Sequence, residues 1–239
     1  VTFKGVKKSS KDNEEQYYRG KYIQTLVDDR DYHNLISDKQ VQLFAGTKYH
    51  FSRPFYDQKI DYLFIDEAGQ VSLADVIVMG TIARNIILIG DQMQLPQPIQ
   101  GEHPGESGKS VLDYLLQGKD TILDSHGVFL KKTYRLHPNL NDFISENFYE
   151  NRLLINEKNI NRKIDYKKSS IIQSEGIHTI LMKHEDRSQT SLEEFETVKK
   201  LMDQLIGSKF RDFDNSERKI SVNDILIVSP FNAQVNFLK

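Results

Sequence analysis

The chain has 239 residues, of which 38% are hydrophobic and 28% charged, a composition typical of a soluble globular protein. Its net charge of −2 excludes a strongly basic nucleic-acid-binding chain, although not a local basic groove, and its lack of cysteine excludes disulfides and cysteine-ligated metal sites. No apolar run approaches the roughly 18 residues of a membrane span and no signal-peptide core is present, so we expect a cytoplasmic protein without membrane contact.

The first half of the chain predicts a parallel sheet. Residues 1–40 are polar and charged, and Tyr17 to Ile36 is their most helical stretch. Short apolar runs follow, of the kind found in strands buried on both faces of a parallel sheet. The runs are V-Q-L-F-A-G (41–46), D-Y-L-F-I-D (61–66) and N-I-I-L-I-G-D (85–91). Residues 71–84 read as a crossover helix, so the sequence predicts a βαβ unit.

The second half predicts a further set of helices and strands. In chain order these are a short helix from Ser110, a strand at 127–134, a helix at 139–154, a surface excursion at 156–174, a strand at 177–182, a helix at 191–207, a strand at 224–230 and the start of a helix at 231–239. The helix at 191–207 opens with a capping box of Ser191 and Glu194. Together the elements predict an α/β fold with parallel sheets and flanking helices, in two lobes that meet near residue 127.

Gly108-Lys109-Ser110 is reminiscent of a phosphate-binding loop but does not fit one. The loop pattern is G-x-x-x-x-G-K-[ST], in which backbone amides wrap the phosphates and the lysine reaches their outer oxygens. The first glycine belongs at position 103, which is His103. A buried strand should also precede the loop directly, and none does. We interpret the segment as a flexible connection in which Ser110 caps the next helix, so a kinase or GTPase built on Lys109 is disfavoured.

Two adjacent carboxylates, Asp66 and Glu67, end the strand predicted at 61–66. Ligands of α/β proteins bind at the carboxyl ends of parallel strands. In nucleotide hydrolases such a pair holds magnesium and orients or deprotonates the attacking water. Taken alone, the two residues could equally well cap the next helix.

The Asp-Glu pair begins a series of four motifs. These are D-E-A-G-Q at 66–70, G-D-Q-M-Q-L-P at 90–96, T-Y-R-L-H-P at 133–138 and P-F-N-A-Q at 230–234. In this order the chain resembles the superfamily 1 helicases, in particular the 5′→3′ subgroup that contains the nonsense-mediated-decay and Okazaki-fragment-processing helicases. The resemblance runs from about residue 41 to the end. It implies P-loop NTPase (RecA-like) lobes, both incomplete, at 1–126 and 127–239.

The resemblance implies roles for residues of the first lobe. Asp66 would hold Mg²⁺, and Glu67 would be the general base. Gln94 would sense the γ-phosphate and couple it to the nucleic-acid path, and Gln70 is assigned to the nucleotide. Thr47 matches a threonine that touches the backbone of the single strand, although a plain strand-end hydroxyl explains it equally well.

Further roles fall in the second lobe. Tyr134 would stack on adenine, and Arg135 would be an arginine finger, whose permanent charge suits a transferring phosphoryl group. A structural ion pair is the alternative for Arg135. Gln234 is expected to contact nucleic acid, and His137 to pack and hydrogen-bond at the lobe interface. The histidine and acids at 184–186 are interpreted as a solvated surface rather than a metal site.

The resemblance thus implies a helicase that uses ATP and Mg²⁺ to translocate along and unwind nucleic acid, with single-stranded DNA favoured over RNA. The family's phosphate-binding loop and its last motifs do not occur in residues 1–239. We therefore expect an internal part of the two-lobe core that is inactive alone and self-associates through incomplete sheets. The alternative is a non-catalytic nucleic-acid-binding or scaffold module, which retention of Asp66, Glu67, Gln94 and Arg135 disfavours.

Overall fold

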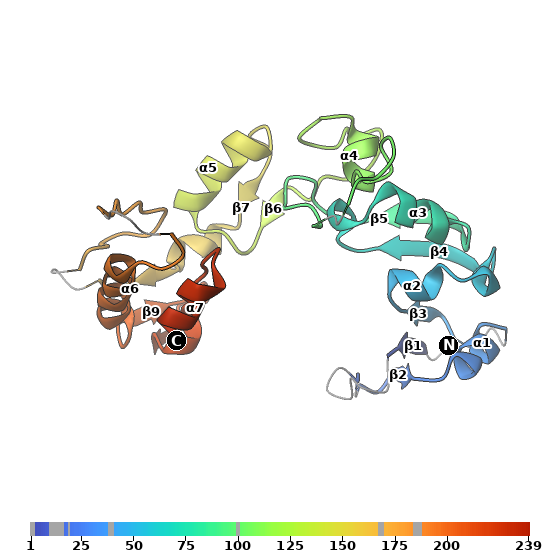
Figure 1. The fold of residues 1–239 in the computed structure, drawn as a ribbon, viewed down its shortest axis with the longest axis horizontal. Helices are drawn as coiled ribbons and strands as arrows, with labels where there is room; N and C mark the ends of the chain where they lie inside the picture. The colour runs from blue at the N-terminus through green and yellow to red at the C-terminus, as the bar shows by residue number, and fades with distance from the viewer. Residues whose placement is uncertain are drawn as a thin grey trace. The chain divides into compact units, whose positions relative to one another are not determined.

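The structure is a computed structural model and describes residues 3–9, 17–18, 20–37, 41–98, 101–166, 170–183 and 188–239. The chain divides into two compact units, Val1–Asp120 and Thr121–Lys239. Each unit combines helices with short strands (Figure 1), so the predicted α/β fold with parallel sheets and flanking helices is confirmed. The assignment of residues 1–126 and 127–239 to two RecA-like lobes stays a prediction.

The described part of the first unit contains two parallel sheets. Its elements are β1 (Gly5–Lys8), β2 (Ile23–Leu26), α1 (Asp29–Ser37), β3 (Leu43–Ala45), α2 (Lys48–Phe51), β4 (Ile60–Ile65), α3 (Leu73–Gly80), β5 (Ala83–Leu88) and α4 (Val111–Leu116), with short 3-10 helices at Pro54–Tyr56 and Ala68–Gln70. β1 pairs with β2 and β3, and β4 pairs with β5, all in parallel. The predicted βαβ unit is confirmed as β4, α3 and β5.

The core of the first unit lies on one face of β4. Leu63 and Ile65 belong to the same buried cluster as Val76 of α3, which lies beside the strand pair (Figure 1). Successive side chains of a strand point to opposite faces, and the alternate residues Tyr62 and Phe64 are 56% and 60% exposed. The expectation of strands buried on both faces is therefore wrong for β4, because the described residues cover only one face of this pair.

The N-terminal stretch also differs from its prediction. Among the described residues of the stretch from Tyr17 to Ile36, the helix begins only at Asp29, as the start of α1 (Asp29–Ser37), and Ile23–Leu26 forms β2 instead. β2 pairs residue for residue with β1, from Ile23 beside Gly5 to Leu26 beside Lys8. Strand pairing with a distant segment thus overrides a weak local helical pattern.

The second unit mixes parallel and antiparallel pairs. Its elements are β6 (Lys132–Thr133), α5 (Pro138–Phe148), β7 (Leu154–Ile155), β8 (Lys163–Ile164), α6 (Leu192–Leu205), β9 (Lys209–Arg211), β10 (Glu217–Lys219) and α7 (Asn232–Leu238), with 3-10 helices at Glu157–Asn161 and Val222–Asp224. β6 pairs in parallel with β7, and β9 pairs antiparallel with both β8 and β10. The predicted helices are confirmed as α5, α6 and α7, and Ser191 caps α6 by accepting the Glu194 N–H at 3.2 Å.

Several predicted boundaries of the second unit are wrong. Of the strand expected at 127–134 only β6 forms, and the described residues at 177–182 and 224–230 contain no strand. Their apolar side chains are exposed, for example 89% for Leu181 and 87% for Leu226. An apolar run becomes a strand only where another segment pairs with it, and the run itself does not encode that partner. Conversely, the excursion at 156–174 includes β8, which pairs with β9.

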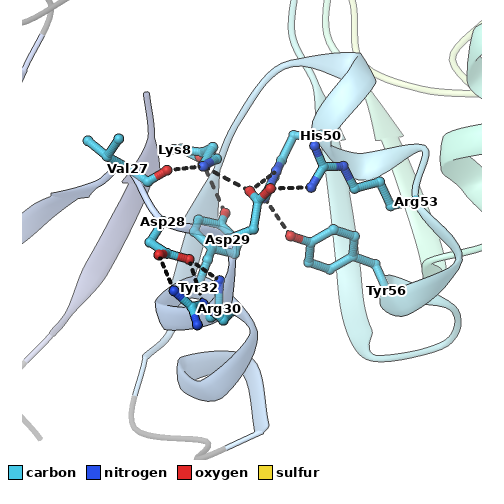
Figure 2. Close-up of polar contacts among 10 residues, drawn as sticks. Lys8, Val27, Asp28, Asp29, Arg30, Tyr32, His50, Arg53 and Tyr56 are labelled. Atoms are coloured by element: carbon cyan, nitrogen blue, oxygen red, sulfur yellow. Dashed lines mark hydrogen bonds and ion pairs between the residues drawn. The ribbon is translucent and has the colours of Figure 1, made fainter. Parts of the chain in front are cut away.

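A polar cluster at the start of α1 joins separate segments of the first unit (Figure 2). Asp29 lies 2.8 Å from Lys8 of β1 and 2.5 Å from Arg53. Hydrogen bonds from Lys8 and Arg53 lower the pKa of the Asp29 carboxyl to about 2. The buried His50 of α2 points its Nδ1 toward Asp29 at 3.9 Å, and its Nε2 lies 2.6 Å from the hydroxyl of Tyr56. The cluster therefore ties α1 and α2 to β1.

The buried His50 predicts a stability that depends on pH. His50 is 4% exposed, and burial lowers its pKa to about 4 although Asp29 opposes the shift. An unfolded chain protonates histidine near pH 6.5, so between about pH 6.5 and 4 the unfolded state binds a proton that the folded state does not. We expect the free energy of unfolding to fall by about 3 kcal/mol as the pH drops through this window, measured by urea denaturation.

The matched variant His50→Gln keeps a polar side chain that does not titrate. Its free energy of unfolding should change much less over the same pH window than that of the wild-type chain. An equal fall in both proteins would assign the pH dependence to groups other than His50.

Candidate functional site

The D-E-A-G-Q motif forms the turn at the carboxyl end of β4. Ile65 accepts the N–H of Ile89, and Ile89 accepts the N–H of Ala68, both at 2.9 Å. Asp66 and Glu67 therefore lie between two backbone bonds that fix the turn to the segment after β5, and both side chains are exposed. One Asp66 carboxylate oxygen accepts the Glu67 N–H at 3.0 Å. The carboxylates thus lie at the edge where α/β proteins bind ligands.

Glu67 holds its backbone in the left-handed region, with φ 54° and ψ 41°. A residue with a Cβ pays about 1 kcal/mol for this conformation. The Gln70 N–H donates to the Glu67 carbonyl at 2.8 Å and closes the turn. Gln70 is itself exposed at the end of the turn. Strain of this kind persists where the surrounding structure enforces it, and it is found often at functional sites.

Two glycines let the G-D-Q-M-Q-L-P motif pack against this turn. A Cβ at Gly69 would lie 2.2 Å from the carbonyl oxygen of Asp91, and a Cβ at Gly90 would lie 2.6 Å from the backbone nitrogen of Ala68. Neither glycine has a positive φ, so the requirement is one of space and not of backbone conformation. The two motif turns therefore touch backbone to backbone.

Replacing Gly69 by alanine is expected to lower the free energy of unfolding by about 3 kcal/mol, because backbone rather than a side chain has to move. Gly80→Ala is the matched control, since its Cβ would meet only the flexible Cδ1 of Ile86, at 2.9 Å. Urea denaturation of both variants should show a large loss for Gly69→Ala and a small one for Gly80→Ala. Equal losses would show that the two turns are free to move apart.

Asp91 orients the second motif. Its Oδ1 accepts the Met93 N–H at 3.0 Å, and its Oδ2 accepts the Gln94 side-chain amide at 3.2 Å. The exposed Gln94 is therefore held on the turn that packs against Gly69. Asp91 is a residue that the sequence analysis missed, although its place directly after the motif glycine was a usable signal.

The Gly-Lys-Ser segment, residues 101–110, packs on the first turn of α3. The carbonyl oxygens of Lys109 and Ser107 accept the first two N–H groups of that helix, at 2.9 and 3.3 Å. The Lys109 ammonium lies 2.6 Å from Glu106. Ser110 caps α4 through its hydroxyl, as predicted. The segment thus turns carbonyl oxygens, not amides, toward its neighbour, which suits a structural connection and not a phosphate cradle.

Thr47 stands immediately before α2 and is exposed. Its carbonyl accepts the N–H of His50 at 3.0 Å, whereas within the described residues its hydroxyl makes no capping hydrogen bond. Tyr49, two residues on, is 75% exposed. An accessible hydroxyl and, two residues on, an accessible ring are the kinds of group that hold single-stranded nucleic acid, through backbone contacts and base stacking. Tyr49 gave no sequence signal, because its exposure follows from the fold alone.

Tyr134 and Arg135 lie side by side just before α5. Tyr134 is 68% exposed, and Arg135 is exposed as well. Among the described residues the Arg135 guanidinium forms no ion pair, whereas Arg162 donates to the backbone carbonyls of Tyr134 and Arg135 at 3.5 and 2.9 Å. His137 caps α5 with its ring nitrogen. The backbone of this motif is therefore held while both candidate side chains stay accessible.

Gln234 has a different environment from the other candidates. It lies on α7 and is 5% exposed. Its amide oxygen accepts the Ser191 N–H at 2.9 Å, and its amide nitrogen donates to the Ser191 carbonyl at 3.2 Å. Both ends of the amide thus hold α7 to the start of α6. This geometry favours a structural role, and the nucleic-acid contact of Gln234 stays a prediction.

The structure therefore gathers part of the predicted site. Two touching turns of the first unit carry Asp66, Glu67, Gln70 and Gln94, and Thr47 stands immediately before α2 of the same unit. One turn of the second unit carries Tyr134 and Arg135. The described residues contain no group of three or more acidic or histidine side chains that could hold a metal, and residues 184–186 lie outside them. No described helix is long and apolar enough to cross a membrane.

Residues 108–239, more than half of the chain, match a protein family described as an AAA domain. The DNA polymerase alpha-associated DNA helicase A of Schizosaccharomyces pombe is 23% identical over 214 residues, which are 86% of this chain and 31% of that protein. The DNA replication ATP-dependent helicase/nuclease dna2 of the same yeast is 29% identical over 112 residues, 46% of this chain and 8% of that protein. Helicase SEN1 of Saccharomyces cerevisiae is 28% identical over 196 residues, 76% of this chain and 8% of that protein.

The chain spans less than a third of the length of each of these relatives. The family implies the use of a nucleotide and a metal ion in general, and these relatives are named as helicases. The family match and the helicase relatives agree with the order of the four motifs along the chain. The chain therefore belongs to this AAA-domain family and is of the superfamily 1 helicase type.

Proposed function

We propose that the chain supplies part of the core of a helicase that couples ATP hydrolysis to translocation along a single strand and to unwinding. One observation carries this proposal. Asp66 and Glu67 are exposed at the carboxyl edge of β4, and Gln94 stands on a second turn that packs against the same motif turn through Gly69. DNA is the favoured substrate, because two similar proteins are named as acting in DNA replication or as a DNA helicase, and RNA is the alternative.

In this proposal the residues of the first unit have separate roles in binding magnesium, transferring a proton and contacting the nucleotide and the strand. The Asp66 carboxylate is an oxygen ligand of the kind that Mg²⁺ prefers, and a bound Mg²⁺ ion would neutralise charge on the phosphates of ATP. Glu67 accepts a proton of the attacking water as the water oxygen bonds to the γ-phosphorus, while the bond from that phosphorus to the β,γ-bridging oxygen breaks and ADP leaves. Gln94 contacts the γ-phosphate, and Gln70 contributes to nucleotide binding. The Thr47 hydroxyl donates to a phosphate oxygen of the strand.

The second unit supplies two exposed side chains. The Tyr134 ring stacks on the adenine base, because an exposed aromatic face suits a heteroaromatic ring. The Arg135 guanidinium stabilises the negative charge that develops on the transferring phosphoryl group. The lack of an Arg135 ion pair within the described residues supports this role over the structural alternative.

Residues 1–239 contain no G-x-x-x-x-G-K-[ST] pattern, the loop that cradles the phosphates of ATP in such enzymes. We therefore expect the isolated chain to hydrolyse no ATP, and the natural full-length protein to hydrolyse ATP faster when single-stranded DNA is added. A phosphate-release assay on both proteins tests this. Lys109→Ala is the control that should leave ATP binding unchanged, because Lys109 pairs with Glu106.

The results of these assays distinguish the proposed helicase from the alternative functions. Turnover by the isolated chain would contradict its expected inactivity, and loss of ATP binding in Lys109→Ala would restore the Gly-Lys-Ser segment as a phosphate site. A full-length protein that binds single-stranded DNA but never hydrolyses ATP would establish the second candidate, a non-catalytic nucleic-acid-binding or scaffold module. The lack of a phosphate-binding loop in these residues is the observation that favours that candidate.

We also propose that the two units are parts of two RecA-like lobes and that the chain self-associates. Apolar side chains support association, since Phe64, Leu181 and Leu226 are 60%, 89% and 87% exposed. Phe64 shares one exposed face of β4 with Tyr62, and an uncovered apolar face of a sheet favours contact with another chain. Light scattering that finds a clean monomer at high concentration would contradict self-association. A cytoplasmic location stays a prediction.

A further inference from the structure

Lys48 and Asp75 form an ion pair between two helices of the first unit. The Lys48 ammonium on α2 lies 2.7 Å from the Asp75 Oδ2 on α3, and the side chains are 26% and 30% exposed. The two residues are 27 positions apart in the chain. The pair therefore connects elements that the backbone joins only through β4 and its following turn.

Asp75 is held in place by Ser72 as well as by Lys48. Its Oδ2 accepts the Ser72 hydroxyl at 2.9 Å, and its N–H donates to the Ser72 oxygen at 3.1 Å. Burial raises the pKa of Asp75, but the hydrogen bonds from Lys48 and Ser72 outweigh burial, so the pKa lies below its ordinary value. The hydrogen bond to Asp75 raises the pKa of Lys48. Both groups are therefore charged at neutral pH.

Each end of the pair lies next to a candidate functional residue. Lys48 is the first residue of α2 and directly follows Thr47. The position of Thr47 therefore depends on the position and orientation of α2. Asp75 is in the first turn of α3, which begins after the short turn that Glu67 opens. That turn is packed on the second motif through Gly69. A movement of α2 against α3 would therefore reach both Thr47 and Glu67.

We propose that Lys48 is a positioning residue that, through Asp75, links binding of a single nucleic-acid strand at Thr47 to the catalytic turn at Glu67. The inference rests on the proposed function and names how the strand stimulates hydrolysis. The pair is partly exposed, and ion pairs of this kind contribute little to stability. The ion pair matters for function because it joins the segment that carries Thr47 to the segment that follows the Glu67 turn.

The alternative reading of Lys48 is a direct contact with a phosphate of the strand. Asp75→Asn separates the two, because it removes the ion pair, keeps a side chain that bonds Ser72, and leaves the Lys48 charge available. If Lys48 acts through Asp75, both Lys48→Met and Asp75→Asn weaken the stimulation. If Lys48 contacts a phosphate directly, Asp75→Asn leaves the stimulation intact or strengthens it.

The test measures ATP hydrolysis by the natural full-length protein with and without saturating single-stranded DNA. We expect Lys48→Met and Asp75→Asn each to lower the stimulation about fivefold, at the lower end of the range for coupled sites. The rate without DNA should stay unchanged, and the double variant should lose no more than either single one. Lys48→Arg, which keeps the charge, should recover most of the stimulation.

Lys109→Met is the matched control, because it breaks another lysine–carboxylate pair of the same unit. That pair, with Glu106, lies within one segment and does not join two motif segments. It should leave the stimulation unchanged. Additive losses in the double variant, or full stimulation in Asp75→Asn, would overturn the inference while the proposed function stands. A wild-type protein that shows no stimulation by DNA would instead overturn the proposed function, and this inference with it.

Discussion

Replacing Arg135 by alanine is expected to slow ATP hydrolysis by the full-length protein by about 10³-fold or more, the effect of losing an arginine finger. The side chain is exposed and forms no ion pair among the described residues, so its removal leaves no partner uncompensated. The free energy of unfolding should therefore change by less than about 0.5 kcal/mol. Arg135→Lys should restore little activity, because an ammonium lacks the planar fork that binds two phosphoryl oxygens.

Arg162→Ala is the matched control for this prediction. Arg162 is also an arginine of the second unit, but it bonds the carbonyls of Tyr134 and Arg135 and lies 3.0 Å from Asp212. Its loss should lower stability as well as activity. Single-turnover hydrolysis and urea denaturation of both variants distinguish the two roles. A rate within tenfold of wild type in Arg135→Ala, or a loss of stability as large as that of Arg162→Ala, would speak for a structural arginine.

Glu67→Gln is expected to lower the hydrolysis rate by about 10²- to 10⁴-fold, the usual contribution of a general base. Glutamine has the same shape as glutamate but does not take up the proton of the attacking water. The side chain is exposed at the end of β4, so the free energy of unfolding should stay as it was. A rate close to that of the wild type would remove Glu67 from the mechanism.

Glu67→Gly separates catalysis from strain at the same position. Because φ is 54° here, glycine relieves a conformation that costs a residue with a Cβ about 1 kcal/mol. We expect this variant to lose as much activity as Glu67→Gln and to gain up to about 1 kcal/mol in the free energy of unfolding. A loss of stability in Glu67→Gly would show that the turn does not store strain.

Local patterns account for the parts of the fold that were predicted well. β4, α3 and β5 follow from two apolar runs around a helical stretch, and the helix from Leu192 is fixed by the Ser191 cap. The motif residues were located for the same reason. Asp66 and Glu67 end an apolar strand, and such an end places them at the edge of the sheet.

Pairing and packing between distant segments account for the parts of the fold that were predicted wrongly. β2 forms because β1 lies beside it, and the apolar runs at 177–182 and 224–230 stay unpaired within the described residues although each reads as a strand. The motif pattern likewise gave no sign that Gln234 is buried against Ser191. Strand formation and side-chain burial depend on a second segment that pairs or packs with the first. The sequence of one segment does not show which other segment that will be.

The sequence by itself determined the family and the order of the motifs, and it proposed the side chains for the chemistry of hydrolysis, because residue type and short-range spacing carry that information. Only the tertiary structure decided that the motif turns touch through Gly69 and Gly90, and that Lys48 reaches Asp75. Those contacts join residues far apart in the chain, and they exist only once the strands have paired and the helices have packed.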